Sequence, residues 1–175
     1  HPLGDFSAPC AAGLFSLADT ARLLRIHGDA MQSAVPVGEG AMAAIIGLEH
    51  GDVSAVCDEA AAAGACQIAN DNGGGQLVIS GSKAAVEKAA ALATEKGAKR
   101  AIMLPVSAPF HSALMAPAAD AMRHALANVE KRNPVVPVVA NVRAAPVTDA
   151  GEIADLLVSQ VTGQVIHVNG GLLMP

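Results

Sequence analysis

The first eight residues, HPLGDFSA, have the residue types that end a nucleophile elbow, the sharp turn that exposes a catalytic side chain before a helix. The position that would carry the nucleophile holds Pro2. Proline has no hydroxyl group and no backbone N–H, so it can form no acyl-enzyme. The sequence therefore excludes covalent catalysis at Pro2.

His111 is the second candidate for chemistry, in the segment SAPFHSALM. It lies between a predicted strand and a predicted helix, at the kind of junction where proteins often carry catalytic groups. A histidine that caps or packs at the start of a helix would fit the same spacing. The residues alone leave both interpretations open.

The composition of the chain narrows the classes of function that the protein can have. The 175 residues fit one domain, or one domain with a small insertion, and 52% of them are hydrophobic. Lys and Arg number 11 against 16 Asp and Glu, a net charge of -5 without any basic run, which argues against nucleic-acid binding. No stretch is long and apolar enough to cross a membrane, and the expected location is the cytoplasm.

Metal binding is not predicted. The six histidines never occur at the close spacing of helix-borne or finger-type metal sites. Cys10, Cys57 and Cys66 are widely spaced and form no CxxC pair. They are expected to be small buried side chains in a reducing compartment.

The N-terminal elements must position the elbow. Ser16 and Asp19 form a capping-box-like start, and the apolar spacing that follows predicts a helix over about 17–34. The stretch before it would form a shorter helix with Pro9 in its interior. A proline there removes a backbone hydrogen bond, at a cost of roughly 3 kcal/mol if the helix stays regular.

Residues 41–106 have the pattern β-α-β-β-α-β, with NGGG turning the middle strands, which is typical of a ferredoxin-like unit. The last of these strands is predicted over 100–106. Beyond it the sequence predicts a helix, a short buried strand and another helix, and the tail from 163 begins like a strand. These elements are expected over 111–132, 136–141 and 152–162.

Several of these segments together resemble the malonyl-CoA:acyl-carrier-protein transacylases, over about residues 1–165. The segments occur in family order and at family spacing. They are HPLGDFSAPCAAGLFSLADTARLL, GDAMQSAVPVGEGAMAAIIGL, ANDNGGGQLVISG, APFHSALMAPAAD, VPVVANVRAAPVTD and LLVSQVTGQV.

The resemblance implies an α/β fold, a partial α/β-hydrolase-like acyltransferase domain with a ferredoxin-like insertion. Residues 1–40 and 107–175 would belong to the large domain, and 41–106 to the inserted subdomain. Both ends look truncated relative to the family.

The implied chemistry is a ping-pong transfer of malonyl groups in fatty acid biosynthesis. A serine attacks the thioester of malonyl-CoA, a histidine takes and returns the proton, and acyl carrier protein collects the acyl group. The protein would need no cofactor of its own, since the partner carries the phosphopantetheine.

The resemblance also assigns roles to five residues. His111 matches the catalytic histidine, Phe110 matches the residue before it, and Gln160 matches the glutamine beside it. Leu3 follows the nucleophile position and would supply an oxyanion amide. Met31 matches a methionine of the acyl pocket, although plain core packing would explain it equally well.

Two residues depart from the family pattern. Pro2 replaces the nucleophilic serine, and His27 replaces the arginine that grips the malonyl carboxylate. A guanidinium offers a permanent charge and a bidentate fork, whereas a histidine is mostly neutral above a pKa of about 6.5. Selectivity for a charged acyl group should suffer.

Three hypotheses follow. The chain is a transacylase that is inactive or severely impaired as written, or an active transferase of which only part is present, against which Pro2 argues. Alternatively, it is a non-catalytic module that binds acyl-CoA or the carrier protein.

Overall fold

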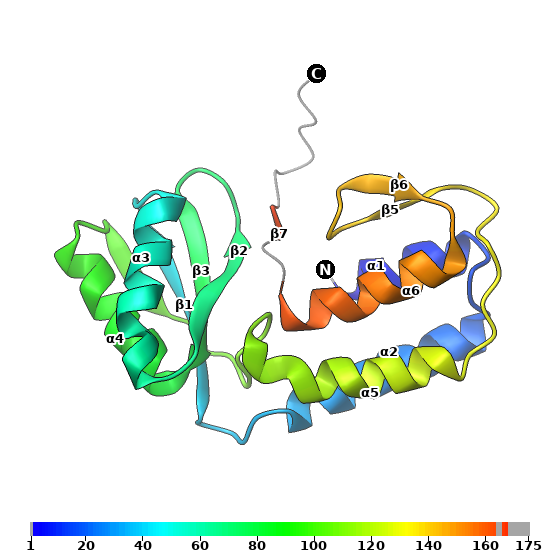
Figure 1. Ribbon diagram of the computed structural model, residues 1–175, viewed down its shortest axis with the longest axis horizontal. Helices are drawn as coiled ribbons and strands as arrows, with labels where there is room; N and C mark the ends of the chain where they lie inside the picture. Colours follow the sequence, from blue (N-terminus) through cyan, green and yellow to red (C-terminus); the bar gives the residue numbers. More distant parts are fainter. Residues whose placement is uncertain (1, 164–165, 168–175) are drawn as a thin grey trace.

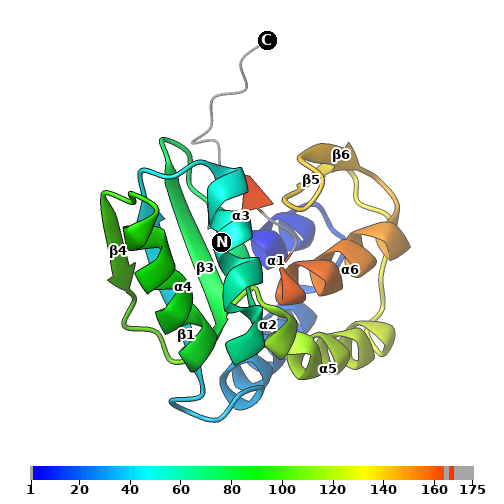
Figure 2. The ribbon, with the colours of Figure 1, turned by 60° about the vertical axis from the view of Figure 1, so that its left-hand side comes forward.

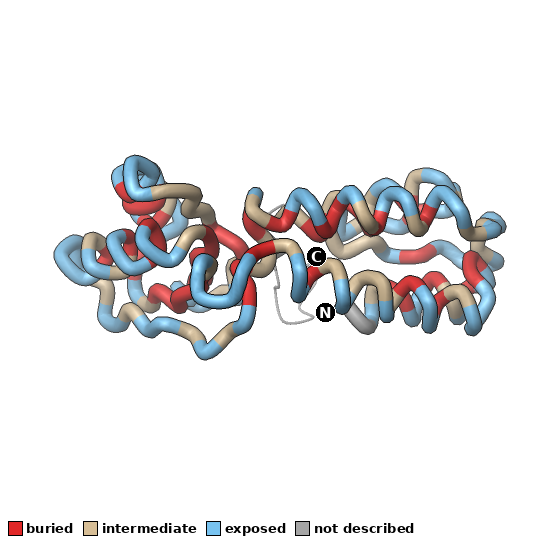
Figure 3. Tube along the Cα trace, turned by 90° about the horizontal axis from the view of Figure 1, so that it is seen from below, coloured by how far each residue is buried: buried red, intermediate tan, exposed pale blue. Residues whose placement is uncertain are grey.

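The computed structural model describes residues 2–163 and 166–167, and it describes side chains over 4–163. The chain forms two units side by side, a sheet covered by two helices and a group of four further α-helices (Figure 1). Seen from below, the molecule is elongated, and buried positions recur along both units (Figure 3). Two hydrophobic clusters form the main cores, one in each unit.

The first two helices start the helical unit. α1 spans Pro2–Ala11 and α2 spans Leu17–Ser33. The predicted cap of α2 is present, since the Ser16 side chain accepts a hydrogen bond of 3.0 Å from the backbone N–H of Asp19. α1 continues through Pro9, whose fully buried ring gains apolar contacts that offset part of the lost backbone bond.

The sheet has the order β4-β1-β3-β2-β7. Neighbours among the first four strands are antiparallel, and β7 pairs parallel with β2. The strands are β1 (Gly40–Ile46), β2 (Cys66–Asp71), β3 (Gln76–Ser82), β4 (Arg100–Met103) and β7 (Ile166–His167).

Alternation along the strands gives the sheet two buried faces. Ala43 and Ile45 of β1, with Ile79 of β3, pack under α3 (His50–Ala60) and α4 (Lys83–Glu95). A short 3-10 turn, Ala61–Ala63, follows α3. Met42 and Val78 belong to the opposite face. That face is turned toward the helical unit (Figure 1), and Figure 2 shows α3 and α4 in front of the strands that they cover.

The rest of the helical unit comes from the C-terminal part of the chain. α5 (Ala116–Ala127) packs against α2 and α6 (Ala150–Ser159), with short 3-10 turns at Ala113–Met115 and Gln160–Thr162. A hairpin of β5 (Val138–Ala140) and β6 (Ala145–Val147) lies beyond them (Figure 1). Of the helices described here, none has the length and apolarity to cross a membrane.

Some predicted bounds were wrong. The helix expected over 111–132 begins at Ala116, because Pro117 fits only a first turn, and it ends at Ala127, where Asn128 donates a side-chain hydrogen bond of 2.8 Å to the His124 carbonyl. The strand expected over 100–106 ends at Met103, ahead of Pro105. Strand β6 was not predicted, since Pro146 disfavours a strand. Residues 164–165 and 168–175 of the expected tail strand lie outside the described residues.

Candidate functional site

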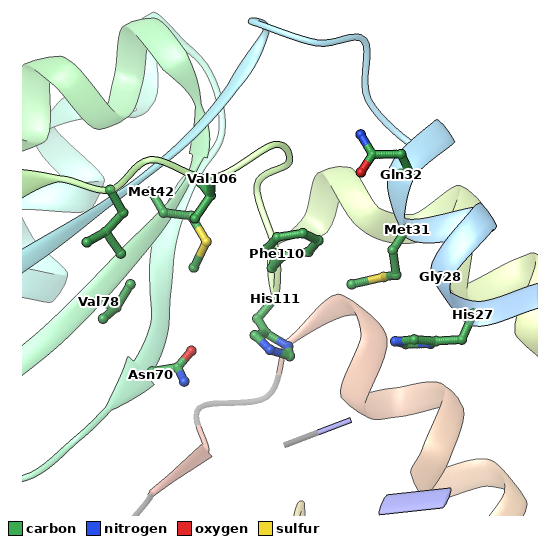
Figure 4. A pocket seen from close by; sticks show the side chains of 11 residues that line it. His27, Gly28, Met31, Gln32, Met42, Asn70, Val78, Val106, Phe110 and His111 are labelled. Atoms are coloured by element: carbon green, nitrogen blue, oxygen red, sulfur yellow. The ribbon is translucent and has the colours of Figure 1, made fainter. Parts of the chain in front are cut away.

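A cavity of about 510 Å³ lies between the sheet and the helical unit (Figure 4). It takes side chains from α2, from three strands and from the loop after β4. Its lining consists of His27, Gly28, Met31, Gln32, Met42, Asn70, Val78, Leu104, Val106, Phe110 and His111.

Helix α2 forms one wall. His27 and Met31 are one turn apart and share a face of the helix, as residues four positions apart do. Met31 is 5% exposed and also packs in the core of the helical unit. The wall is therefore fixed by the same packing that stabilises the helix.

The sheet forms the opposite wall. Asn70 and Val78 are paired across β2 and β3, and Met42 lies on β1. These side chains belong to the face that α3 and α4 do not cover. The side-chain Oδ1 of Asn70 is buried and has no hydrogen-bond partner among the described residues.

The loop between β4 and α5 closes the site from the side. Pro109 packs on Gly40, where a Cβ atom would come within 2.3 Å of the proline ring, so this close approach requires glycine. The Ser107 hydroxyl donates a hydrogen bond of 3.2 Å to Oε1 of Gln32, and the Ser112 hydroxyl donates one of 2.7 Å to the Pro109 carbonyl. The loop is thus attached both to the sheet and to α2.

The backbone of His111 has a left-handed conformation, with φ of 56°. Its carbonyl lies against Gly163, where an added Cβ atom would be 2.2 Å from the His111 oxygen. The amide of Gln67 lies at the same turn: Nε2 donates a hydrogen bond of 3.4 Å to the His111 carbonyl, and Oε1 accepts one of 2.9 Å from the Ala113 N–H. Contacts from β2 and from Gly163, which follows the turn Gln160–Thr162, thus support this conformation.

The imidazole of His111 is oriented by the main chain. Nδ1 lies 3.1 Å from the carbonyl oxygen of Gln160. A carbonyl can only accept, so Nδ1 carries the proton and Nε2 keeps its lone pair in the neutral ring. Burial lowers the pKa of His111, although the Gln160 carbonyl acts in the opposite direction. Near neutral pH the ring is a neutral acceptor, the form that a general base requires.

Gln160 is itself held by α1. Its side-chain Nε2 donates a hydrogen bond of 2.6 Å to Oδ2 of Asp5, and the residue is only 8% exposed. Asp5, Gln160 and His111 therefore form a chain of contacts from α1 to the cavity.

His27 and His111 point toward one another in the cavity (Figure 4). Burial lowers the pKa of His27, the proximity of His111 lowers it further, and Asp5 opposes both effects. The Nδ1 atom of His27 is buried without a hydrogen-bond partner among the described residues. His27 thus presents an uncharged and unsatisfied polar group.

The structure brings four residues singled out from the sequence to this cavity: His27, Met31, Phe110 and His111. Gln160 lies behind His111 and lines an adjoining recess. The backbones of Pro2 and Leu3 begin α1, whereas their side chains lie outside the described part of the chain.

Sequence reasoning missed Gln67, Asn70 and Gly163. No spacing signal marks them, because each reaches the site through a long-range contact. In the part of the chain that the structure describes, no group of three or more His, Cys, Asp or Glu side chains could hold a metal ion.

Comparison with known proteins gives a consistent match. The family model of the acyl transferase domain matches residues 1–162. The malonyl CoA-acyl carrier protein transacylase of Escherichia coli K12 is 47% identical over 165 residues, which cover 94% of this chain and 53% of that protein. The Bacillus subtilis protein of the same name is 45% identical over 166 residues, which cover 94% of this chain and 52% of that protein.

Solved structures show the same relationship. An acyl-carrier-protein-S-malonyltransferase from Bartonella henselae is 62% identical with a TM-score of 0.89, covering 95% of this chain and 53% of that one. A malonyl-transacylase solved in complex with its type II polyketide synthase acyl-carrier protein is 42% identical with a TM-score of 0.89. The match covers 94% of this chain and 53% of that one. This chain spans about half the length of the relatives that it matches.

Proposed function

Because the chain belongs to the acyl transferase domain family, we propose that its cavity is the acyl site of a malonyl-CoA:acyl-carrier-protein transacylase, with His111 at the position of the base. The observation that carries the proposal is the orientation of His111. Its Nδ1 contacts the Gln160 carbonyl at 3.1 Å, which leaves Nε2 as the proton acceptor.

Three further assignments follow from this cavity, and a fourth, Leu3, follows from the resemblance. Met31 and Phe110 form its apolar wall and would contact the acyl chain, and His27 would contact its far end. The backbone N–H of Leu3 is the proposed oxyanion donor. The substrate would be malonyl-CoA, in fatty acid biosynthesis, without a cofactor held by the chain itself.

The partner would be an acyl carrier protein that presents the acyl group on phosphopantetheine. Support comes from the names of the relatives and from the malonyl-transacylase solved with its carrier protein. The volume of the cavity, about 510 Å³, is within the usual range for small-molecule sites, about 300–1,000 Å³.

Covalent transfer is the step that this sequence does not support. A serine hydroxyl would attack the thioester carbonyl, lose its proton to His111 and expel the thiol, whereas Pro2 offers no atom for that attack. We infer that the chain as written is inactive or severely impaired. The second candidate function, favoured by Pro2 together with an intact cavity, is non-catalytic binding of acyl-CoA or of the acylated carrier protein.

The organisation of the chain completes the proposal. We infer that residues 41–106 are a ferredoxin-like subdomain inserted into an α/β-hydrolase-like large domain formed by 1–40 and 107–175. The antiparallel order β4-β1-β3-β2 and the two helices on one face support this assignment.

Intact-mass spectrometry tests the role of Pro2. The purified chain is mixed with malonyl-CoA and then with holo acyl carrier protein, beside the variants P2S and P2A. We expect a malonyl adduct on P2S and none on the original chain or on P2A. Adding H111A to P2S should abolish the adduct, because the base is lost.

Two results would change the proposal. An adduct on the original chain would show that another residue is the nucleophile. Absence of an adduct on P2S, while the variant still binds malonyl-CoA in calorimetry, would show that residue 2 is wrongly assigned.

A further inference from the structure

Among the residues that the structure describes, no fixed charge lines the cavity of about 510 Å³. Its eleven lining residues include no Asp, Glu, Lys or Arg. Six of them form apolar walls: Met31, Met42, Val78, Leu104, Val106 and Phe110. The polar side chains that remain are two histidines and two amides.

The two histidines provide little positive charge at neutral pH. Burial lowers the pKa of both His27 and His111. The carboxylate of Asp5 acts on both rings and lies close enough to accept a hydrogen bond from Gln160 beside them. A carboxylate entering this cavity would lie near Asp5, which lines the adjoining recess, and would find no Lys or Arg among the described lining residues.

Malonyl has such a carboxylate at its free end. Moving a carboxylate from water into an apolar site is unfavourable unless a cation or several donors pair with it. An uncharged acyl group escapes this penalty.

We propose that this cavity selects an uncharged short acyl group, presented as a pantetheine thioester, over the malonyl group, and that His27 determines this choice. The inference rests on the proposed acyl-binding function and refines its choice of acyl group: malonyl-CoA would still bind, but more weakly than an uncharged thioester. It requires only binding, so it holds for a chain without a nucleophile.

Isothermal titration calorimetry with the full chain at pH 7.5 tests the proposal. Acetoacetyl-CoA and malonyl-CoA are matched probes, because they have the same length and differ by a methyl group in place of a carboxylate oxygen. We expect acetoacetyl-CoA to bind about tenfold more tightly, a difference of about 1.4 kcal/mol. Binding of CoA alone measures how much of the affinity comes from the part of the ligand without the acyl group. Acetoacetyl-pantetheine tests whether the nucleotide is needed for binding.

Variants at His27 test whether this side chain determines the preference between the two acyl groups. H27R should strengthen binding of malonyl-CoA and remove the preference, since a guanidinium pairs with a carboxylate. H27Q keeps an uncharged hydrogen-bonding group and should leave the order unchanged. Circular dichroism and thermal unfolding identify a variant that fails to fold, and the comparison on the original chain stands without either variant.

The possible outcomes separate the two proposals. Malonyl-CoA binding as tightly as acetoacetyl-CoA, or more tightly, would overturn the preference and leave acyl binding intact. If CoA alone binds as well as both thioesters, the acyl group stays outside the cavity and the preference is again overturned. If no thioester binds the folded chain, the proposed function itself is overturned.

Discussion

His111 depends on the absence of a side chain at residue 163. Gly163 has φ of 79°, and a Cβ atom there would lie 2.2 Å from the His111 oxygen. We expect Gly163→Ala to destabilise the chain by more than about 1 kcal/mol, because both the backbone angle and the contact oppose alanine. Urea unfolding measures the change.

Gly51→Ala is the matched control. Gly51 lies in α3, where an added Cβ atom meets nothing within 4 Å. Alanine should leave the free energy of unfolding unchanged or raise it slightly. Equal effects of the two substitutions would contradict the role given to Gly163.

The paired histidines make stability depend on pH. The pKa values of His27 and His111 are lowered in the folded chain, whereas unfolded histidines titrate near a pKa of about 6.5. As pH falls below that value, the unfolded state takes up protons first, so the free energy of unfolding decreases until the folded pKa values are passed. Urea unfolding at several pH values should show this loss.

Replacement of His27 isolates its share of the pH effect. In H27Q the free energy of unfolding should decrease less steeply as the pH falls, because one of the two histidines with a lowered pKa is removed. His50→Gln, at the exposed start of α3, is the control for loss of a histidine. A decrease of the same steepness in both variants would show that His27 does not contribute.

At the scale of elements, Gln67 joins β2 to the turn that carries His111. It makes two hydrogen bonds to that turn, at 3.4 and 2.9 Å. We expect Gln67→Ala to lower the free energy of unfolding by about 1–2 kcal/mol and to speed exchange of the Ala113 amide hydrogen. Gln76→Ala, at the exposed start of β3, should do neither.

Two cysteines report on the packing of α3 against β2. The Sγ atoms of Cys57 and Cys66 are 3.5 Å apart, and the contact with Cys57 lowers the pKa of Cys66. These two sulfur atoms are in contact, and a disulfide bond between them would have a length of about 2.05 Å. Oxidation by diamide, which takes up the two hydrogens, should therefore link them within one chain.

Peptide mapping by mass spectrometry identifies the link. Cys10, on α1, should remain a thiol, and Cys57→Ser should abolish the intramolecular product. A link from Cys10 to either of the other cysteines within one chain would contradict the packing described here.

Local signals were enough to predict most elements. The Ser16 cap, the apolar spacing of α2 and the alternation along β1 and β3 are encoded within short segments, and these elements are present. Helix α1 shows the limit of that reasoning, because burial of Pro9 depends on distant packing.

The candidate site could be predicted only in part. The resemblance indicated His27, Met31, Phe110, His111 and Gln160, which lie in or beside the cavity. The contacts that hold them come from residues far away in sequence. Gln67 is 44 positions from His111, and Asp5 is 155 positions from Gln160, so no local pattern could reveal either contact.

At the scale of the whole molecule, the cavity lies where the two units meet. Phe110 packs against the core of the helical unit and also against the cluster of Met42, Ala69 and Val78 on the sheet. The same residue lines the cavity (Figure 4). The site is therefore a product of the packing between the units.

Met31, Met42 and Val78 are wall residues and core residues at once. A substitution that reshapes the wall therefore also changes the packing that keeps the chain folded. In evolutionary terms, substitutions at these positions can change which ligand binds only while the folded state remains stable enough. His27 shares this coupling, because its ring packs against Phe6 of the core with the ring centroids 5.8 Å apart, so a change of ligand at the polar wall also affects stability.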